Sequence, residues 1–442
     1  MSEWPRFQKY ARRMRTLTER GAIYDPTAQL LSILQLCTTN EPLLPNLKRF
    51  RLWSTAGEFI PFVPLFLSPR TTVVDIEFKK SGLPKAKVAS MLAAFPMLCP
   101  NLQKITLQSL PTDPIITVAV SNMLLASNRD NLRCFQVDSP LTEEAREVVY
   151  KLPDLRELSV VIERDTSLPS VVLPNLTELA ISCDDKGDWV QLFHRATFGR
   201  LEGVTFYPRS KQIGDLLEAF KKIALATSTL NMLSELSIYT TRSWNPSYSS
   251  LLPFTKLTYL LIQFTCDDEC SSGVDDNVIM DLAQAMPKLK TLILGDGPCS
   301  EITIGVTAEG LAALAHRCPN LSTLCVHFLV DTLSADPSTI GGATSNVGSA
   351  PLRKDCALTD LEVGHIPLPE ESVSAVTLTL ARIFPHINCI DYADKNWERV
   401  LDAIRLSRQL PIAQVRNAFS LHLKAALMTP LQEPLARAIV SR

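Results

Sequence analysis

The sequence lacks the features of a membrane or secreted protein. No stretch of about 18 consecutive apolar residues occurs, although a helix needs roughly that length to cross a bilayer. The N-terminus also lacks a charged region followed by an apolar core and a small-residue cleavage site, which is the pattern of a secretion signal. We therefore expect no membrane association and a cytoplasmic or nuclear location.

An excess of basic charge is missing as well. The 44 lysines and arginines are balanced by 46 aspartates and glutamates, which gives a formal net charge of −2. Proteins that bind nucleic acid through its phosphates usually present a strongly basic surface. The composition thus argues against a nucleic-acid-binding protein.

Motifs of known enzymes are absent too. The sequence has no HExxH, GxSxG, GxGxxG or P-loop pattern, and its 6 histidines are widely separated. Cys325 and His327 lie two residues apart on an expected strand, so a Cys/His nucleophile pair is an alternative. No further motif supports this pair, and we expect neither enzyme activity nor a cofactor.

The 11 cysteines are odd in number and never spaced as CxxC. Several lie in apolar segments, which is typical of reduced thiols that pack as small hydrophobic side chains inside a cell. Cys266 and Cys270, with three acidic residues between them, raise the alternative of a metal site. Because zinc sites usually need a second pair of ligands and none stands nearby, we expect a solvated acidic loop and no metal.

One short pattern recurs along most of the chain. It reads LPNLKRFRL at 44–52, CPNLQKITL at 99–107, LPNLTELAI at 173–181 and CPNLSTLCV at 318–326. First positions of successive copies are about 21 to 37 residues apart, in or just above the ~20–29 residues of leucine-rich repeats. The apolar positions of the copies are Leu47/Phe50/Leu52, Val73/Ile76/Phe78, Leu102/Ile105/Leu107, Leu132/Phe135/Val137, Leu155/Leu158/Val160, Leu176/Leu179/Ile181, Leu201/Val204/Phe206, Leu233/Leu236/Ile238, Leu257/Leu260/Ile262, Leu289/Leu292/Leu294, Leu321/Leu324/Val326, Leu358/Leu361/Val363 and Ile387/Ile390/Tyr392.

Helix-like segments lie between many of these strands. A chain of 442 residues exceeds the ~250–300 residues that a single core usually supports, whereas a repeat array adds core unit by unit. We predict an α/β leucine-rich-repeat solenoid of about 13 repeats, an irregular horseshoe with a parallel concave sheet and outer helices. A doubly wound sheet is the alternative, but such sheets do not repeat LPxLxxLxL. The expected helices are 84–95, 114–126, 142–152, 211–226, 278–286 and 307–318.

The two ends of the array need caps that shield the terminal cores. We expect three regions: a helical connector and cap at 1–40, the solenoid at 41–395 and a helical cap at 396–442. Helices are expected at 25–38, 396–410 and 411–429 from their apolar spacing. The loop 331–354, which is rich in Ser, Thr, Gly, Ala and Pro, is expected to be mobile.

Side chains that alternate with the buried positions of each strand should line the concave face. Tyrosine is enriched in binding hot spots, and an exposed apolar patch usually marks a partner site. We therefore predict a partner-binding patch here, unless loops 240–254 or 329–357 fold over it. Its predicted residues are Tyr207, Tyr239, Tyr259, Leu261, Ile293 and His327.

The first twenty residues, MSEWPRFQKYARRMRTLTER, have apolar residues at helical spacing and one basic face. A targeting peptide, a membrane anchor and a nucleic-acid arm are alternatives. The two acids and the missing serines favour a connecting helix whose apolar side packs on the first repeat. Trp4, Phe7, Met14 and Leu17 should then pack on the first repeat, and Trp4 and Phe7 would also contact a partner domain at this end.

Two segments resemble a known family. The stretch VTAEGLAALAHRCPNLSTLCV at 306–326 resembles the cysteine-containing repeat of F-box proteins. The opening W-x-R-F-x-x-Y-A-x-R-x-R-x-L and the LPNL and CPNL repeats resemble F-box/leucine-rich-repeat proteins of mushroom-forming basidiomycete fungi. The resemblance implies that Thr307 caps a helix, that Leu311 and Leu314 pack inside, and that Cys318 is buried near the helix end.

The F-box itself has no counterpart in residues 1–45, which contain no L-P-x-E-type helical trio. The resemblance implies the substrate-recognition part of an adaptor for a Skp–cullin–F-box ubiquitin ligase, with a protein substrate on the concave face. The Skp adaptor should bind only if an F-box stands upstream. The alternative is a free-standing leucine-rich-repeat scaffold, inhibitor or decoy without a ligase link.

Overall fold

The structure is a computed structural model of the chain. It describes residues 3–409, apart from 21–29, 36–41, 56–58, 79–83, 112, 128, 164–169, 184–185, 209–215, 227–231, 241–246, 265–272, 296–304, 334–355, 365 and 393. The predicted loop 331–354 and the predicted helix 411–429 therefore lie wholly or mostly outside the described residues, as does most of the predicted helix 25–38.

The protein is an α/β structure built on a 14-stranded parallel sheet, whose strands follow one another in chain order. Two short strands, β7 (Val171–Leu173) and β9 (Ala196–Phe198), pair with each other in a separate sheet. The strands of the main sheet are β1 (Thr16–Arg20), β2 (Arg49–Thr55), β3 (Val73–Phe78), β4 (Lys104–Gln108), β5 (Cys134–Val137), β6 (Glu157–Ile162), β8 (Glu178–Cys183), β10 (Gly203–Pro208), β11 (Glu235–Thr240), β12 (Tyr259–Phe264), β13 (Thr291–Leu294), β14 (Thr323–Val326), β15 (Asp360–Gly364) and β16 (Cys389–Tyr392).

Helices connect most of these strands, as parallel neighbours require. Short 3-10 turns occur at Ile60–Phe62, Tyr248–Leu251 and Glu370–Ser372. The helices are α1 (Glu3–Ala11), α3 (Val63–Phe66), α4 (Lys85–Leu98), α5 (Pro114–Ala126), α6 (Glu143–Tyr150), α7 (Lys186–Arg195), α8 (Leu216–Ala226), α9 (Asp276–Ala285), α10 (Ala308–Arg317), α11 (Val330–Leu333), α12 (Val373–Ile383) and α13 (Asn396–Gln409). None of the helices in the described part of the chain has the length and hydrophobicity needed to cross a bilayer.

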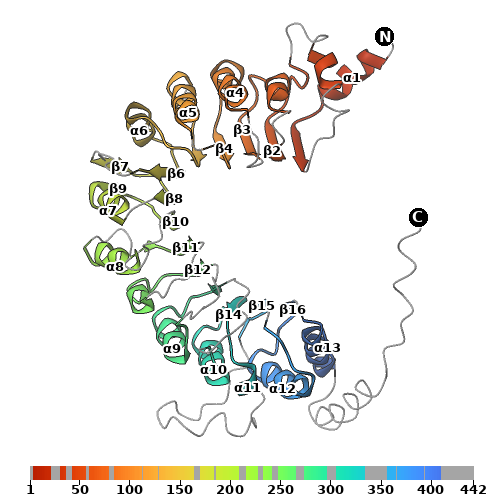
Figure 1. The fold of residues 1–442 in the computed structure, drawn as a ribbon, viewed down its shortest axis with the longest axis vertical. Helices are drawn as coiled ribbons and strands as arrows, with labels where there is room; N and C mark the ends of the chain where they lie inside the picture. The colour runs from red at the N-terminus through yellow and green to blue at the C-terminus, as the bar shows by residue number, and fades with distance from the viewer. Residues whose placement is uncertain are drawn as a thin grey trace. The chain divides into compact units, whose positions relative to one another are not determined.

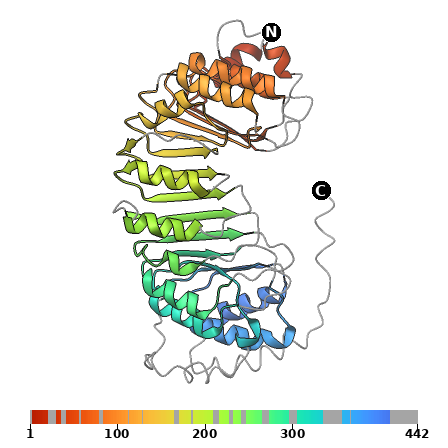
Figure 2. The same ribbon diagram turned by 60° about the vertical axis from the view of Figure 1, so that its left-hand side comes forward.

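The chain divides into two compact units, 1–262 and 263–442. In the first, helices α4, α5 and α6 stand side by side along one face of strands β3 to β6 (Figure 1). In the second, α9 packs against α10 and α12 against α13, and Figure 2 shows the same layering of helices on strands from another side. The predicted boundaries near residues 40 and 395 stay a prediction.

Every predicted apolar triplet has its last two residues in a strand of the main sheet. The leucine frame is wrong at β3, however, because Val74 and Ile76, and not Ile76 and Phe78, lie opposite Phe50 and Leu52 of β2. Thr71 therefore takes the place of the first leucine.

Thr71 is fully buried, yet its polar atoms are satisfied. Its hydroxyl donates to the carbonyl of Leu47 at 3.1 Å and also accepts from the amide of Ser68. Because a threonine occupies this core position, the pattern of apolar residues did not reveal the correct frame.

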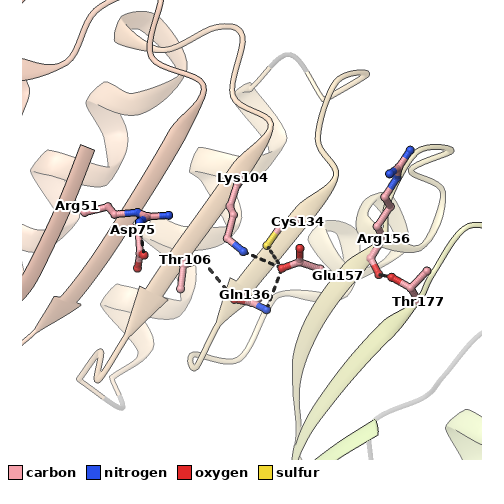
Figure 3. A network of polar contacts seen from close by, with 9 residues as sticks. All are labelled: Arg51, Asp75, Lys104, Thr106, Cys134, Gln136, Arg156, Glu157 and Thr177. Atoms are coloured by element: carbon pink, nitrogen blue, oxygen red, sulfur yellow. Dashed lines mark hydrogen bonds and ion pairs between the residues drawn. The ribbon is translucent and has the colours of Figure 1, made fainter. Parts of the chain in front are cut away.

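Hydrogen bonds at the start of most strands of the main sheet join each strand to the preceding one. The carbonyl of Arg156, for example, accepts from the amides of Thr177 and Glu178 at 2.8 and 3.0 Å. The hydroxyl of Thr177 donates to the same carbonyl at 3.1 Å, as Figure 3 shows. The equivalent hydroxyls of Thr72, Ser234, Thr258, Ser322 and Thr359 donate in the same way to the preceding unit.

Asparagines of the Pro-Asn-Leu repeats add a second set of bonds. The side-chain amide of Asn101 donates to Pro69 O at 3.1 Å, and that of Asn175 donates to Pro153 O at 2.8 Å. The asparagine that usually follows the last leucine of a leucine-rich repeat is mostly absent from these repeats. Asparagine bridges do exist between neighbouring units, but at a different position of the repeat.

Helix starts follow from local capping chemistry. Asp113 accepts from the amide of Ile115 at 2.9 Å ahead of Pro114, and Asp275 accepts from the amide of Val278 at 2.9 Å. Such side chains satisfy amides that have no partner inside the helix. Because the signals are local, six of the predicted helices, 396–410 among them, are confirmed within a few residues, and 211–226 is confirmed over its described part, 216–226.

The family-implied roles in 306–326 also agree with the structure. Thr307 precedes α10 and accepts from the amide of Glu309 at 3.1 Å. Leu311, Leu314 and Cys318 are fully buried, and the thiol of Cys318 donates to Met286 O at 3.5 Å.

The opening segment differs from its prediction. The helix ends at Ala11, and residues 16–20 form strand β1, which pairs in parallel with β2. Arg15 O accepts from the amides of Lys48 and Arg49, so the same backbone joint that links the repeats starts here. A helix running to residue 20 was wrong because edge pairing overrides a weak helical period.

Candidate interaction surface

One face of the sheet carries the side chains that alternate with the buried ones; we call it the open face. In parallel strands, residues in register stack into rows across the sheet. Glu157, Glu178, Gly203 and Glu235 are in register on β6, β8, β10 and β11. The surface is thus ordered in rows, and each row can be examined for charge and size.

Over β4, β5 and β6 the open face carries a closed polar network (Figure 3). The Lys104 ammonium lies 2.7 Å from Glu157 Oε2. The same oxygen accepts from Cys134 Sγ at 3.0 Å and from Gln136 Nε2 at 3.3 Å. Burial raises the pKa of Glu157, but the bonds from Cys134 and Lys104 outweigh it and hold the pKa below its usual value. The Glu157 carboxylate is therefore neutralised and hydrogen-bonded by side chains of the same chain.

A second ion pair lies beside it on β2 and β3. Arg51 Nε is 3.8 Å from Asp75 Oδ2, too far for a good hydrogen bond. Burial raises the pKa of Asp75, and the charges of Arg51 and Lys104 lower it in part. In this part of the face, acids therefore stand next to bases of the same chain.

Over β10 to β12 the open face becomes aromatic, as predicted. The Tyr207 and Tyr239 rings are stacked with centroids 5.1 Å apart and planes 11° from parallel. Tyr207 is 44% exposed, while Tyr239 and Tyr259 are half-buried. Parts of the loops that were expected to cover these rings, 241–246 and 334–355, lie outside the described residues.

The prediction for Leu261 is wrong in its exposure. Alternation along β12 directs this side chain to the open face, but only 7% of it is exposed. Leu261 is therefore a buried residue of this part of the sheet and not an exposed contact residue. Ile293 on β13 and His327 after β14 are half-buried and belong to the second unit.

The hypothesis of an exposed Cys/His pair is also wrong. Cys325 is 6% exposed, and its thiol donates to Gly295 O at 3.2 Å. It therefore packs as a buried thiol next to the half-buried His327. Among the residues that the structure describes, no group of three His, Cys, Asp or Glu could hold a metal ion. Cys266 and Cys270 lie outside them.

A row of acids, which was not recognised as a row from the sequence, borders the tyrosines. Glu178 and Glu235 are exposed, and Gly203 lies between them. Burial raises the pKa of Glu178, and the charges of Glu157 and Glu235 raise it further. The signal was present as the repeated L-x-E-L of LRELSV, LTELAI and LSELSI, with LEGVTF replacing the acid by glycine.

Trp4 and Phe7 stack on α1 with ring centroids 5.1 Å apart. Phe7 is 38% exposed, and Ala11 is the buried residue of this helix. The expected packing of the aromatic side on the first repeat is wrong for Phe7, since it faces solvent.

Cysteine reactivity follows from burial. Burial raises the pKa of Cys99 and of Cys318 to about 12, so these thiols stay protonated near neutral pH. Cys389 is exposed. Native alkylation with iodoacetamide should modify Cys389 and spare Cys99 and Cys318, as read by peptide mass spectrometry. In urea all three should react. Equal labelling in the native state would contradict the described burial.

No family model matches the sequence, and no curated protein shows significant similarity to it.

Proposed function

We propose that the protein is a leucine-rich-repeat solenoid of about 13 repeats, curved as an irregular horseshoe, that binds a partner protein on its concave face. The observation that carries this proposal is the open face itself. It presents a stacked tyrosine pair and, separated from it by one row of small residues, exposed carboxylates, while helices cover the opposite face. Enriched aromatic side chains on an otherwise polar surface are characteristic of binding hot spots.

The chemistry of the described residues fits binding better than catalysis. The thiols of Cys134 and Cys325 are buried and hydrogen-bonded. The Lys104 and Glu157 side chains satisfy each other. A surface of this kind is suited to recognising another molecule and leaves it chemically unchanged.

The link to ubiquitin ligation rests on the family resemblance of residues 306–326 and of the opening segment. We propose that the protein acts as the substrate-recognition part of such an adaptor, and that an F-box domain would pack on Trp4 and Phe7. The Skp adaptor should co-purify with the protein only when an F-box precedes residue 1, whereas a free-standing scaffold would not bind it in either form. An adaptor bound to residues 1–442 alone would contradict the absence of an F-box in residues 1–45.

Substitution of Tyr207 and Tyr239 by alanine should abolish capture of the partner in a pull-down from cells. The stacked pair is worth about 0.5–1.5 kcal/mol beyond its buried area, so the fold should survive. Substitution of Ile115 and Val118, which are 55% and 49% exposed on α5, is the matched control and should leave capture unchanged.

Two outcomes would contradict this expectation. Undiminished capture by the tyrosine variant would place the binding surface elsewhere. A loss of stability of several kcal/mol would indicate that segments of this chain cover the two rings.

A further inference from the structure

The charges of the open face are balanced in one part and unbalanced in the next. Arg51 stands beside Asp75, and Lys104 stands beside Glu157. Glu178 and Glu235, one and three strands further along than Glu157, make no ion pair with a described residue within 4.0 Å. The unbalanced negative charge of Glu178 and Glu235 is complementary to a positively charged group of another molecule.

The two free carboxylates flank a space without a side chain. A Cβ at Gly203 would lie 3.6 Å from Glu178 Cγ and 3.8 Å from Glu235 Cβ, which are ordinary contact distances. The glycine is therefore not needed for packing, and a side chain would fit there. Gly203 is buried, and the side chains of Glu178 and Glu235 lie within 4.0 Å of the position that a Cβ would take, so a flat group would lie across the two carboxylates above it.

Tyrosines border the same space. Tyr259 lies directly beside Glu235, because the Tyr259 amide bonds to Ser234 O at 3.1 Å. Burial raises the pKa of Tyr259, and the charges of Tyr239 and Glu235 raise it further, which is consistent with this contact. Ala180, Thr205 and Ser237 occupy the next row and are small. The stacked Tyr207 and Tyr239 lie beyond them on the same strands.

We propose that the open face over β8, β10, β11 and β12 binds an arginine side chain of the partner protein, with the guanidinium between Glu178 and Glu235. A planar guanidinium can donate to two carboxylates at once and can stack on an aromatic ring, whereas an ammonium is a compact point charge. The residues that flank the arginine would pack on Tyr207 and Tyr239. This inference rests on the proposed function and names the chemistry of the partner.

The test starts from a displayed random peptide library selected on the immobilised full chain. Arginine should be enriched in the selected peptides. The dissociation constant of the best peptide is then measured by fluorescence polarisation. The double variant Glu178→Gln/Glu235→Gln should weaken binding about tenfold or more, because both partners of the guanidinium lose their charge.

Two further variants sharpen the test. Glu143→Gln/Glu144→Gln removes two exposed acids at the start of α6, on the helical side, and should leave binding within about twofold, since exposed remote charges are screened. Gly203→Lys places a cation of the chain itself between the two acids and should weaken binding while both carboxylates remain. Replacement of the peptide's arginine by lysine should weaken binding as well.

The outcomes separate the two proposals. Arginine-free peptides that bind the glutamine variant unchanged but fail to bind Tyr207→Ala/Tyr239→Ala would overturn the inference and leave the proposed function standing. Arginine peptides that bind the glutamine variant as tightly as the wild type would also overturn it. If no peptide is enriched and the pull-down captures nothing, both proposals fail.

Discussion

Replacement of Trp397 by alanine should destabilise the protein by about 3–5 kcal/mol, the usual cost of removing a large buried aromatic side chain. Trp397 is fully buried at the start of α13 and meets Phe328 edge to face, with centroids 5.8 Å apart. Its indole N–H donates to Ile366 O at 2.9 Å. The variant would leave both a cavity and an unsatisfied buried carbonyl.

The hydrogen bonds next to Trp397 should be weakened together with its packing, because they join the same two segments. Asp394 accepts from the amide of Leu368 at 3.1 Å, and Asn396 donates back to Leu368 O at 2.8 Å. The start of α13 is thus joined to the segment 366–368 at several points. Urea denaturation followed by circular dichroism measures the free energy of unfolding.

Two variants control the Trp397 experiment. Trp397→Phe keeps most of the ring and loses the hydrogen bond, so it should cost less than alanine. Leu406→Ala, at a side chain that is 51% exposed on the same helix, should change stability by less than about 0.5 kcal/mol. An alanine variant at Trp397 that is as stable as the wild type would contradict the described packing of α13.

Gly199→Ala is the second substitution with a large expected effect. A Cβ at this position would lie 2.5 Å from Pro174 O and 3.1 Å from Pro174 C and Cα. All three are backbone atoms, so no side chain can rotate away to relieve the overlap. We expect a loss of about 1–3 kcal/mol, as is typical of overpacking.

The structural consequence of Gly199→Ala should be local. The Gly199 amide donates to Leu173 O at 3.3 Å, next to the pairing of β7 with β9. Hydrogen exchange should therefore accelerate at 171–173 and 196–199 before other strands. Gly203→Ala, four residues later, meets only ordinary contacts and should be neutral or slightly stabilising. Equal stability of the two alanine variants would contradict the described close approach.

Much of the fold was predictable because its signals are local and periodic. The L-x-x-L-x-L triplets place two of every three apolar residues in a strand, and caps such as Asp275 and Thr307 mark helix starts. The failure at Thr71 has the opposite cause. A buried hydroxyl satisfied by the Leu47 carbonyl replaces a leucine, and hydrophobic patterning does not register it.

The candidate surface was only partly predictable, since exposure depends on neighbouring strands. Alternation gave the correct direction for Tyr207 and Leu261, but the first is 44% exposed and the second 7%. The row formed by Glu178, Gly203 and Glu235 arises from strand register between distant segments. In the sequence, these three residues can be recognised as one row only when equivalent positions of several repeats are aligned.

The joints between units use backbone carbonyls and the hydroxyls of residues such as Thr177 and Ser234. Residues in register on the open face, such as Glu178 and Gly203, take part in these joints only through their backbone amides, and their side chains are not needed for them. The framework and the proposed recognition face therefore depend on different side chains. Under the proposed function, substitutions on the open face would change what is bound without loosening the framework, which would favour rapid divergence of this face and its use in combinatorial libraries of engineered binders.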